Sequence, residues 1–397
     1  MKKKTTMDLI KTTLFVFTLA LFSCNTSIKS EERLEKAAKQ LVGLREAAIQ
    51  AHRIPRSFAK DSIRWTDTVY DWTEGFWPGT CWMLYGQTRD EAWKQAASDA
   101  QQQYEKHKNL TNDHDLGFIF NNSYGKAFRI TGEAAYKQVL LDAANSLVTR
   151  FNKNVGCIQS WDVTGGWQSQ RGWKFPVIID NMMNLELLFE TFKITGDPKY
   201  KEIAITHANT TMRNHFRPDG SCYHVVDYNP ETGEIASRVT AQGYADESAW
   251  ARGQAWALYA YTMCYRYTRD KKYLDFAEKI AQFILNHPNY PKDGVPYWDF
   301  NAPNIPNEKR DASAGAIMAA AFTELSTYTH DRYLKNAELI LNTLSGPGFM
   351  AKNGENGHFL LLHSVGSIPH GNEVDVPLNY ADYYYIEALL RLKKKGL

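Results

Sequence analysis

Lys193-Ile194-Thr195-Gly196-Asp197-Pro198-Lys199-Tyr200 joins the end of one helical run to the start of the next. Asp197 stands at the N-terminal end of the second run, where a carboxylate meets exposed backbone amides and the positive end of the helix dipole. Tyr200 follows about one turn later, where it can pack the two helices together. The segment therefore predicts a tight turn between two antiparallel helices.

Four other segments repeat this pattern. They are Thr88-Arg89-Asp90 with Trp93, Thr131-Gly132-Glu133 with Tyr136, Thr268-Arg269-Asp270 with Tyr273, and Thr329-His330-Asp331 with Tyr333. Each follows a helical run and opens another, and the repeats are unevenly spaced. Such spacing is typical of helical hairpins with loops of variable length inserted between them.

Two further runs, residues 31–53 and 380–395, supply one more outer and one more inner helix, which makes six pairs. Inner helices are rich in small and aromatic residues, as in 250–267, and outer helices are amphipathic at helical period, as in 333–344. The pattern predicts an all-α fold, a closed (α/α)6 barrel or six-hairpin toroid. The alternative is an open α-solenoid, which would show more uniform repeats and polar capping helices.

The N-terminus predicts export. Residues 1–24 contain a basic start, an apolar run too short to span a bilayer, and Ser23 before Cys24. This is the pattern of a lipoprotein signal peptide with lipidation at Cys24, which would anchor the protein in the cell envelope or periplasm through lipid alone. An ordinary secretory signal is the alternative. Residues 25–397 show no break in composition and are predicted to form one catalytic domain.

Composition excludes some classes of function. The net charge is +2 and there is no basic stripe, which argues against a nucleic-acid partner. The chain is 13% aromatic, with 11 Trp and 22 Tyr, which suits sugar rings but also a large helical core. Four cysteines follow Cys24 without CxxC spacing, and we expect buried free thiols. They are Cys81, Cys157, Cys222 and Cys264.

Two aspartates stand where inner helices are expected to begin. Asp115 lies in Asn112-Asp113-His114-Asp115-Leu116-Gly117-Phe118, and Asp180 in Phe175-Pro176-Val177-Ile178-Ile179-Asp180-Asn181. Either could simply cap its helix. However, inner helices that start on one rim of a toroid would bring both carboxyls to one cavity, and paired carboxyls are the usual equipment for glycosidic chemistry.

A third segment runs from Gln242 to Trp256. Arg252 and Trp256 are four residues apart and share a helix face. Arg252 among Ala and Trp needs an anionic partner, either a structural carboxylate or a ligand carboxylate. His224 lies in the preceding loop and could be structural. No HExxH, Cys/His cluster, GxSxG or phosphate loop is present, so we predict neither a metal site nor a cofactor.

Several of these segments together resemble one known family. The segments are His114–Phe118, Ile179–Leu185, the set Gln242, Arg252 and Trp256, Arg310-Asp311-Ala312-Ser313-Ala314, and Tyr380–Leu390. In order and spacing they resemble the unsaturated glucuronyl hydrolases, glycoside hydrolase family 88, from about residue 70 to the C-terminus. The resemblance implies the same (α/α)6 barrel and a glycosidase without a cofactor.

The resemblance also implies residue roles. Position 180 matches the catalytic general acid/base and position 115 a second essential aspartate. His224, Gln242, Arg252 and Trp256 match residues around the uronate, and Trp77 an aromatic near the sugar. In the segment 363–370, Ser364 and Ser367 match serines that recognise sulfate in some members. Pro369 stands near where those members have a lysine, which leaves His370 as a substitute.

The implied reaction is hydration of the C4=C5 vinyl ether in a 4,5-unsaturated uronic acid at the non-reducing end of glycosaminoglycan lyase products, from chondroitin, hyaluronan or heparin. Three alternatives are an unsaturated rhamnogalacturonyl hydrolase acting on pectin fragments, a sugar 2-epimerase, and a non-catalytic glycan-binding lipoprotein. This sequence shows no pair of barrel histidines suited to the proton transfer of an epimerase, which argues against that alternative. The binding protein would not need Asp115 and Asp180.

Overall fold

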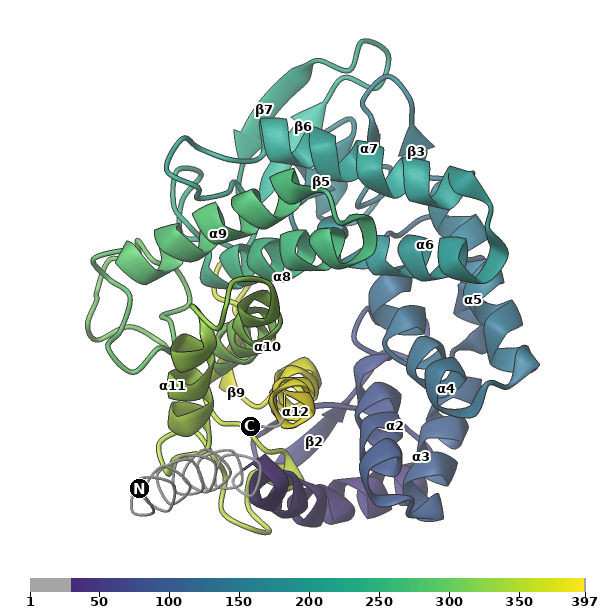
Figure 1. Ribbon diagram of the computed structural model, residues 1–397, viewed down its shortest axis with the longest axis vertical. Coiled ribbons are helices and arrows are strands. Elements are labelled where there is room, and N and C mark those ends of the chain that lie inside the picture. The colour runs from purple at the N-terminus through teal and green to yellow at the C-terminus, as the bar shows by residue number, and fades with distance from the viewer. Residues whose placement is uncertain (1–29, 396–397) are drawn as a thin grey trace, which may run out of the picture.

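The structure, a computed structural model, describes residues 30–395, in which two layers of helices form a closed ring (Figure 1). The inner helices are α2 (Phe76–Thr88), α4 (Tyr124–Thr131), α6 (Asn181–Thr195), α8 (Ala251–Thr268), α10 (Ala312–Tyr328) and α12 (Asn379–Lys394). The outer helices are α3 (Glu91–Gln102), α5 (Ala134–Val148), α7 (Pro198–Asn214), α9 (Lys271–Asn286), α11 (Leu334–Leu344) and the helix of residues 30–51. Because α12 packs against both α10 and α2, the inner layer closes on itself. The predicted (α/α)6 barrel is confirmed, and the open solenoid is wrong.

A shared hydrogen-bond pattern makes the hairpin turns. The Thr195 hydroxyl donates to the carbonyl of Thr191 and accepts the backbone N–H of Asp197, while Gly196 takes a left-handed φ of 75°. The Asp197 carboxylate then accepts the N–H of Lys199 and begins α7. Asp90 and Asp270 are equivalent N-caps, and the threonines at positions 88, 131 and 268 bond in the same way.

The capping prediction is wrong for two of the five turns. Glu133 is the N-cap residue of α5, but its longer side chain makes no capping bond. In the last turn His330 and Asp331 both take a positive φ, so the chain turns further before α11, whose N-cap is Tyr333. Asp331 instead pairs with Lys395 at the end of the described chain.

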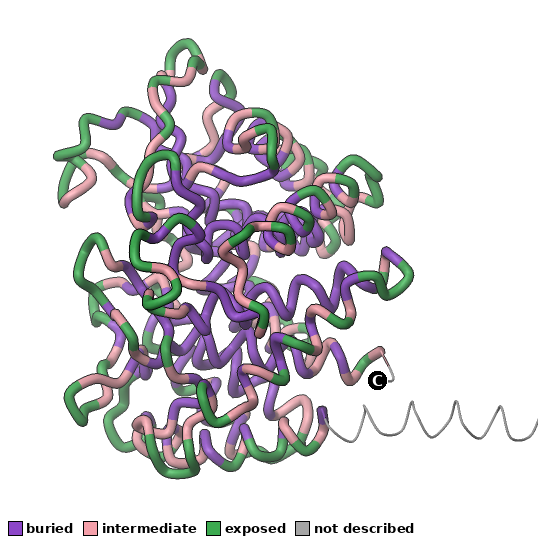
Figure 2. The backbone as a smooth tube through the Cα atoms, turned by 90° about the vertical axis from the view of Figure 1, so that its left-hand side faces the viewer, coloured by how far each residue is buried: buried purple, intermediate pink, exposed green. Residues whose placement is uncertain are grey.

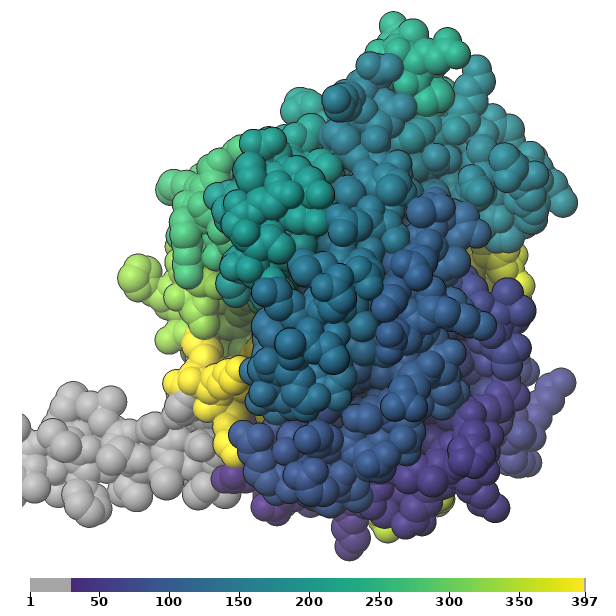
Figure 3. Space-filling view, turned by 90° about the vertical axis from the view of Figure 1, so that its right-hand side faces the viewer, coloured from purple at the N-terminus to yellow at the C-terminus, as the bar shows by residue number. Residues whose placement is uncertain are grey.

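The two ends of the described chain meet at the seam of the ring. Glu31 pairs with Lys393 of α12, and Arg45 pairs with the Asp90 carboxylate at the start of α3. Figure 3 shows the C-terminal residues in yellow beside the first turns of the chain. The helix of residues 30–51 thus completes the outer layer. The predicted signal peptide and Cys24 lie outside the described residues.

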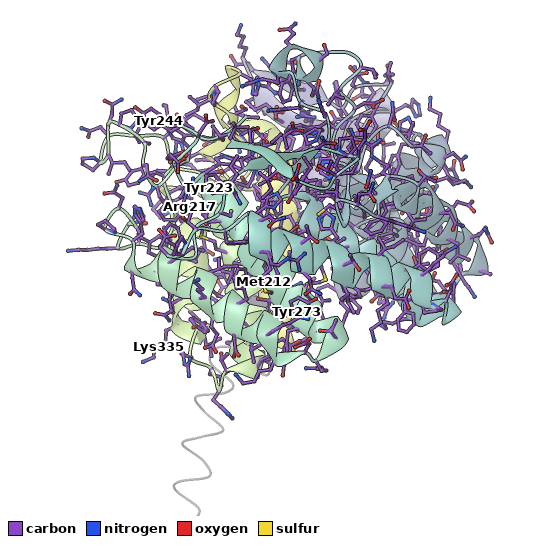
Figure 4. All side chains as sticks on the ribbon, turned by 90° about the horizontal axis from the view of Figure 1, so that it is seen from above. Met212, Arg217, Tyr223, Tyr244, Tyr273 and Lys335 are labelled. Carbon is purple, nitrogen blue, oxygen red and sulfur yellow. The ribbon has the colours of Figure 1, made fainter. Side chains whose placement is uncertain are left out.

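The core fills the space between the layers and most of the ring interior (Figure 2). Helix α10 is buried from Ala312 to Ser326, because its alanines let α8 and α12 approach closely. Outer helices contribute one face each; for example, the Tyr273 hydroxyl of α9 donates to Asn209 of α7, and these helices lie side by side in Figure 4. The four described cysteines are buried and free, as predicted.

Short strands lie in the loops that lead from an outer helix to the next inner helix. They are β1 (Pro55–Ala59) with β2 (Ser62–Trp65), β3 (Phe151–Asn152) with β4 (Cys157–Ile158), the antiparallel sheet of β5 (Pro176–Ile178), β6 (Val225–Tyr228) and β7 (Ile235–Val239), and the hairpin of β8 (Ser364–Ser367) with β9 (Asn372–Val376). These loops gather at the end of the ring where inner helices begin. Among the described residues, no helix is long and apolar enough to cross a membrane.

At the opposite end of the ring a network of ion pairs joins the inner helices. Lys126 of α4 pairs with Glu387 of α12 at 2.7 Å, and Arg391 one turn later pairs with Glu387 and with Glu324 of α10. Arg266 of α8 pairs with Glu324 as well. Lys126, Arg266, Glu387 and Arg391 border a cavity of about 740 Å³ at this end of the ring.

Candidate active site

Asp180 is the first residue of the site. It follows β5 and is the N-cap residue of α6, but its side chain accepts no capping hydrogen bond. The residue is 8% exposed, and its Oδ2 is buried without a hydrogen-bond partner among the described residues. Burial raises the pKa of Asp180 to about 7, and the nearby Arg252 charge opposes this effect. Asp180 can therefore hold a proton near neutral pH.

His224 lies against this carboxyl, with Nε2 at 3.6 Å from Asp180 Oδ2. Its Nδ1 accepts the backbone N–H groups of Ala241 at 3.0 Å and Gln242 at 3.2 Å. Two donors on Nδ1 require the tautomer that carries its proton on Nε2. Burial lowers the pKa of His224 well below its usual value, so the ring stays neutral and its Nε2–H is directed to the site.

Asp115 reaches the same site from the loop before the π-helical turn η2 (Gly117–Asn121). Its Oδ1 accepts Nδ2 of Asn184 at 3.1 Å. Asn184 is four residues after Asp180 and lies on the same face of α6, so the hydrogen bond from Asn184 holds Asp115 on the side of α6 where Asp180 lies. Burial, then the charges of Asp113 and Asp180, raise the pKa of Asp115 well above its usual value. The predicted convergence of Asp115 and Asp180 is what the structure shows, and neither side chain caps its helix.

Trp256 and Gln242 lie around this pair. Trp256 is fully buried, and its Nε1 has no hydrogen-bond partner in the described part of the chain. Buried polar groups are almost always paired, so the unpaired atoms of Asp180, His224 and Trp256 indicate a place for a polar ligand. Gln242 donates from Nε2 to the carbonyl of Gly366 in β8, at 3.3 Å.

Arg252 has a protein partner. It is 1% exposed; Nη1 donates to Asp311 Oδ2 at 3.2 Å and to the carbonyl of Val365, and Nη2 donates to the carbonyl of Gly366 at 2.6 Å. Of the two partners left open by the sequence, the structure contains the structural carboxylate. Arg252 thus ties β8 to the inner helices beside Asp180.

The two predicted serines lie on the β8–β9 hairpin. Ser364 is buried, and its hydroxyl has no partner among the described residues. Ser367 is 6% exposed, and its hydroxyl is 2.7 Å from Nδ1 of His370. His370 in turn packs against Trp167, with ring centroids 5.1 Å apart.

Trp77 does not join this group, contrary to the expectation from the sequence. Its side chain is 3% exposed and borders a groove on the outer layer with Ala48, His52 and Ala100. Trp72 instead packs against aromatics of the inner layer, with ring centroids 5.5 Å from Phe118 and 5.0 Å from Tyr380. Trp77 is the second residue of α2, and its direction depends on where that helix packs.

Three adjacent residues could offer metal ligands. Asp113, His114 and Asp115 bring one ligand atom each within 4.8 Å of one another. However, Asp113 Oδ1 already accepts the N–H of Asp115, and Asp115 accepts Asn184. These carboxylate oxygens already accept hydrogen bonds that stabilise the loop, and we assign no metal ion to them.

The sequence profile of Glycosyl Hydrolase Family 88 matches residues 45–397. The chain belongs to glycosyl hydrolase family 88. A curated family member from Formosa agariphila, named "Unsaturated glucuronyl hydrolase", is 43% identical over 392 residues, which cover 95% of this chain and 96% of that protein. An "Unsaturated chondroitin disaccharide hydrolase" from Streptococcus agalactiae is 33% identical over 93% and 92% of the two chains.

Solved structures of the family share the fold. A crystal structure described as "unsaturated glucuronyl hydrolase specific for heparin" superposes with a TM-score of 0.86 at 46% identity, over 92% of this chain and 98% of the other. An Asp-to-Asn variant of the Streptococcus agalactiae enzyme "complexed with dGlcA-GalNAc6S" gives a TM-score of 0.78 at 31% identity, over 93% and 92%. The protein is therefore a glycoside hydrolase, as predicted.

A cluster of three tryptophans beside the site, Trp161, Trp167 and Trp173, was not predicted from the sequence. Trp161 stacks on Trp173 at 5.8 Å and meets the His224 ring edge-on at 6.0 Å. Trp167 contacts Trp161 at 5.1 Å, and the Arg171 guanidinium lies over Trp167. A usable signal was present, because three tryptophans fall within 161–173 in a glycine-containing loop outside the repeats.

Proposed function

We propose that this hydrolase removes the 4,5-unsaturated uronic acid from the non-reducing end of glycosaminoglycan lyase products. The observation that carries the proposal is a buried, protonatable Asp180 beside a neutral His224 and paired with Asp115. Relatives named for unsaturated glucuronyl and chondroitin disaccharide hydrolysis, and one described as specific for heparin, support the substrate class.

Asp180 would act as the proton donor. The unsaturated ring is a vinyl ether, which accepts a proton at C4 and develops positive charge at C5. Water then adds to C5, and the carboxylate left on Asp180 accepts the proton that this water releases. The hydrated ring opens and frees the remaining sugar. A raised pKa is required because only the protonated carboxyl can start this sequence.

Asp115 and His224 would assist without forming a covalent bond. The Nε2–H of His224 can donate to Asp180 once it is ionised, or to a sugar oxygen beside it. Asp115 remains an acceptor for a ring hydroxyl while Asn184 holds it.

The second sugar would lie between the tryptophan group and the β8–β9 hairpin. Trp161 and Trp167 offer flat faces of the kind that pack on pyranose rings. Arg171 and His370 stand next to them and can donate to a sulfate or carboxylate on that sugar. This chemistry favours acidic or sulfated disaccharides over neutral ones.

The test is the decay of the ultraviolet absorbance of the conjugated uronate. Wild-type protein, Asp180→Asn and the exposed control Asp99→Asn would be given unsaturated chondroitin, hyaluronan and heparin disaccharides, and an unsaturated rhamnose-linked disaccharide from pectin, in parallel. We expect decay with wild type and the control, and a loss of about 10²-fold or more in kcat for Asp180→Asn. Decay only with a rhamnose-linked, pectin-derived disaccharide would overturn the substrate class. No decay with any of them would overturn the function.

We further propose that the protein is exported and anchored through Cys24. The support is the sequence of residues 1–24, with its basic start, short apolar run and Ser23-Cys24. Metabolic labelling with a radioactive fatty acid should mark wild type and not Cys24→Ala. Equal labelling of both would refute the anchor.

A further inference from the structure

Asp311 belongs to the segment 310–314, one of those whose sequence resembles the family, yet it has no part in the proton transfer described above. It is fully buried at the start of α10. Its Oδ1 accepts the N–H groups of Ser313 at 3.0 Å and Ala314 at 3.3 Å, and the Ser313 hydroxyl at 2.6 Å. These bonds form an ordinary N-cap, for which one carboxylate oxygen is sufficient.

The other oxygen of Asp311 binds Arg252, which lies beside Asp180. Oδ2 accepts Nη1 of Arg252 at 3.2 Å, and the N–H of Val365 lies 3.3 Å from Oδ1. The guanidinium also donates to the carbonyls of Val365 and Gly366 and packs over the Trp250 ring at 4.5 Å. Helices α8 and α10 and strand β8 therefore meet at one buried ion pair.

Hairpin β8–β9 depends on this junction for its position beside Asp180. Gln242 donates to the same Gly366 carbonyl that Arg252 holds. On β9, the outer strand of the hairpin, Glu373 accepts two hydrogen bonds from Arg56, of 2.6 and 2.9 Å. Charge-assisted bonds to buried backbone carbonyls are strong and directional, so a shift of the guanidinium would move the inner strand.

We propose that Asp311 is a positioning residue for the reaction, because it fixes the Arg252 guanidinium and, through it, the β8–β9 hairpin against Asp180. This inference rests on the proposed function. Asp311 acts through Arg252 and does not touch the substrate. The same contact supplies a counter-charge, so Asp311 also limits how strongly Arg252 acts on the carboxyl of Asp180.

The electrostatic surroundings give the proposal a specific signature. The polar and charged groups that face Asp180 are Arg252, His224, Asp115, Cys222 and Trp256. The positive charge of Arg252 lowers the pKa of Asp180 against the larger effect of burial. Replacing the Asp311 carboxylate with a neutral amide removes a negative charge from this region. The pKa of Asp180 should then fall, and activity should be lost at a lower pH.

Asp311→Asn is the first variant, because Asn is an equally good N-cap and preserves the start of α10. The matched control is Asp270→Asn, the same exchange at the N-cap of α9 on the other end of the ring. For Asp311→Asn we expect the alkaline limb of kcat/KM to move down by about half a pH unit or more, and KM to rise several-fold. For the control we expect the wild-type profile.

Asp311→Glu separates charge from position and remains informative if Asp311→Asn fails to fold. It keeps the negative charge but moves the carboxylate by one methylene. We expect KM to rise while the alkaline limb stays in place. Unchanged KM and pH profile in the folded variants would overturn the inference. If wild type itself fails to act on any unsaturated disaccharide, the proposed function fails instead, so the two failures are distinguishable.

Discussion

Replacing Asp180 with Asn should stabilise the folded protein above neutral pH while abolishing activity. In the folded chain the pKa of Asp180 is raised from 3.8 to about 7. A carboxyl with a raised folded pKa keeps its proton in the folded state where the unfolded chain has lost it. The free energy of unfolding of the wild type therefore falls as pH rises from about 4 to about 7, and this loss is complete above that range.

The magnitude follows from the shift. About three pKa units at roughly 1.4 kcal/mol each correspond to about 4 kcal/mol of stability lost at pH 8 relative to pH 4. Asp180→Asn lacks this loss because the amide does not ionise. The difference in free energy of unfolding between variant and wild type should then grow by about 4 kcal/mol from pH 4 to pH 8.

Urea unfolding followed by tryptophan fluorescence measures this difference. Wild type, Asp180→Asn and the exposed control Asp99→Asn would be compared at pH 4, 6 and 8 (about the range of the titration). Asp99 lies on the surface of α3, so its replacement should change stability by nearly the same amount at each pH. A stability difference for Asp180→Asn that does not grow with pH would refute the raised pKa and the argument for a protonated donor.

Three further predictions test the geometry. Gly117→Ala should destabilise the fold by about 1–3 kcal/mol and lower kcat, because the new Cβ would lie 2.4 Å from the Cα of Asn184; wild-type unfolding midpoints and kcat would contradict the close packing of the two site segments. Trp77→Phe should leave kcat and KM unchanged in steady-state assays, because Trp77 borders a groove on the outer layer. A raised KM would show instead that Trp77 contacts the sugar. Lys126→Met should lower the free energy of unfolding by about 3 kcal/mol without changing kcat/KM, because it removes one of the cations paired with the buried Glu387 at the far end of the ring; equal stability would show that the network contributes little.

Part of the site could be predicted because it is encoded over short distances. Asp180 precedes a helix, and Arg252 and Trp256 share one helix face, which are properties of neighbouring residues. A toroid then brings the starts of its inner helices to one rim. This is why Asp115 and Asp180 could be placed together before any contact was known.

Other parts could not be predicted from spacing. The Asp311 partner of Arg252 is 59 residues away, and the carbonyl of Gly366 is 114 residues away. The choice between a structural and a ligand carboxylate for Arg252 was therefore open until β8 and α10 were seen to meet it. The tautomer of His224 likewise depends on the backbone amide of Ala241, which a neighbouring strand end brings to Nδ1.

The sequence by itself determined the architecture, because each hairpin turn is stabilised by bonds within about six residues, as between Thr195, Asp197 and Lys199. Tertiary structure decided which tryptophan packs against the inner layer and how strongly Asp180 holds its proton. The first depends on how α2 packs between its neighbours, which leaves Trp72 inside and Trp77 outside. The second depends on burial, which arises only when all of the surrounding segments have closed around the carboxyl.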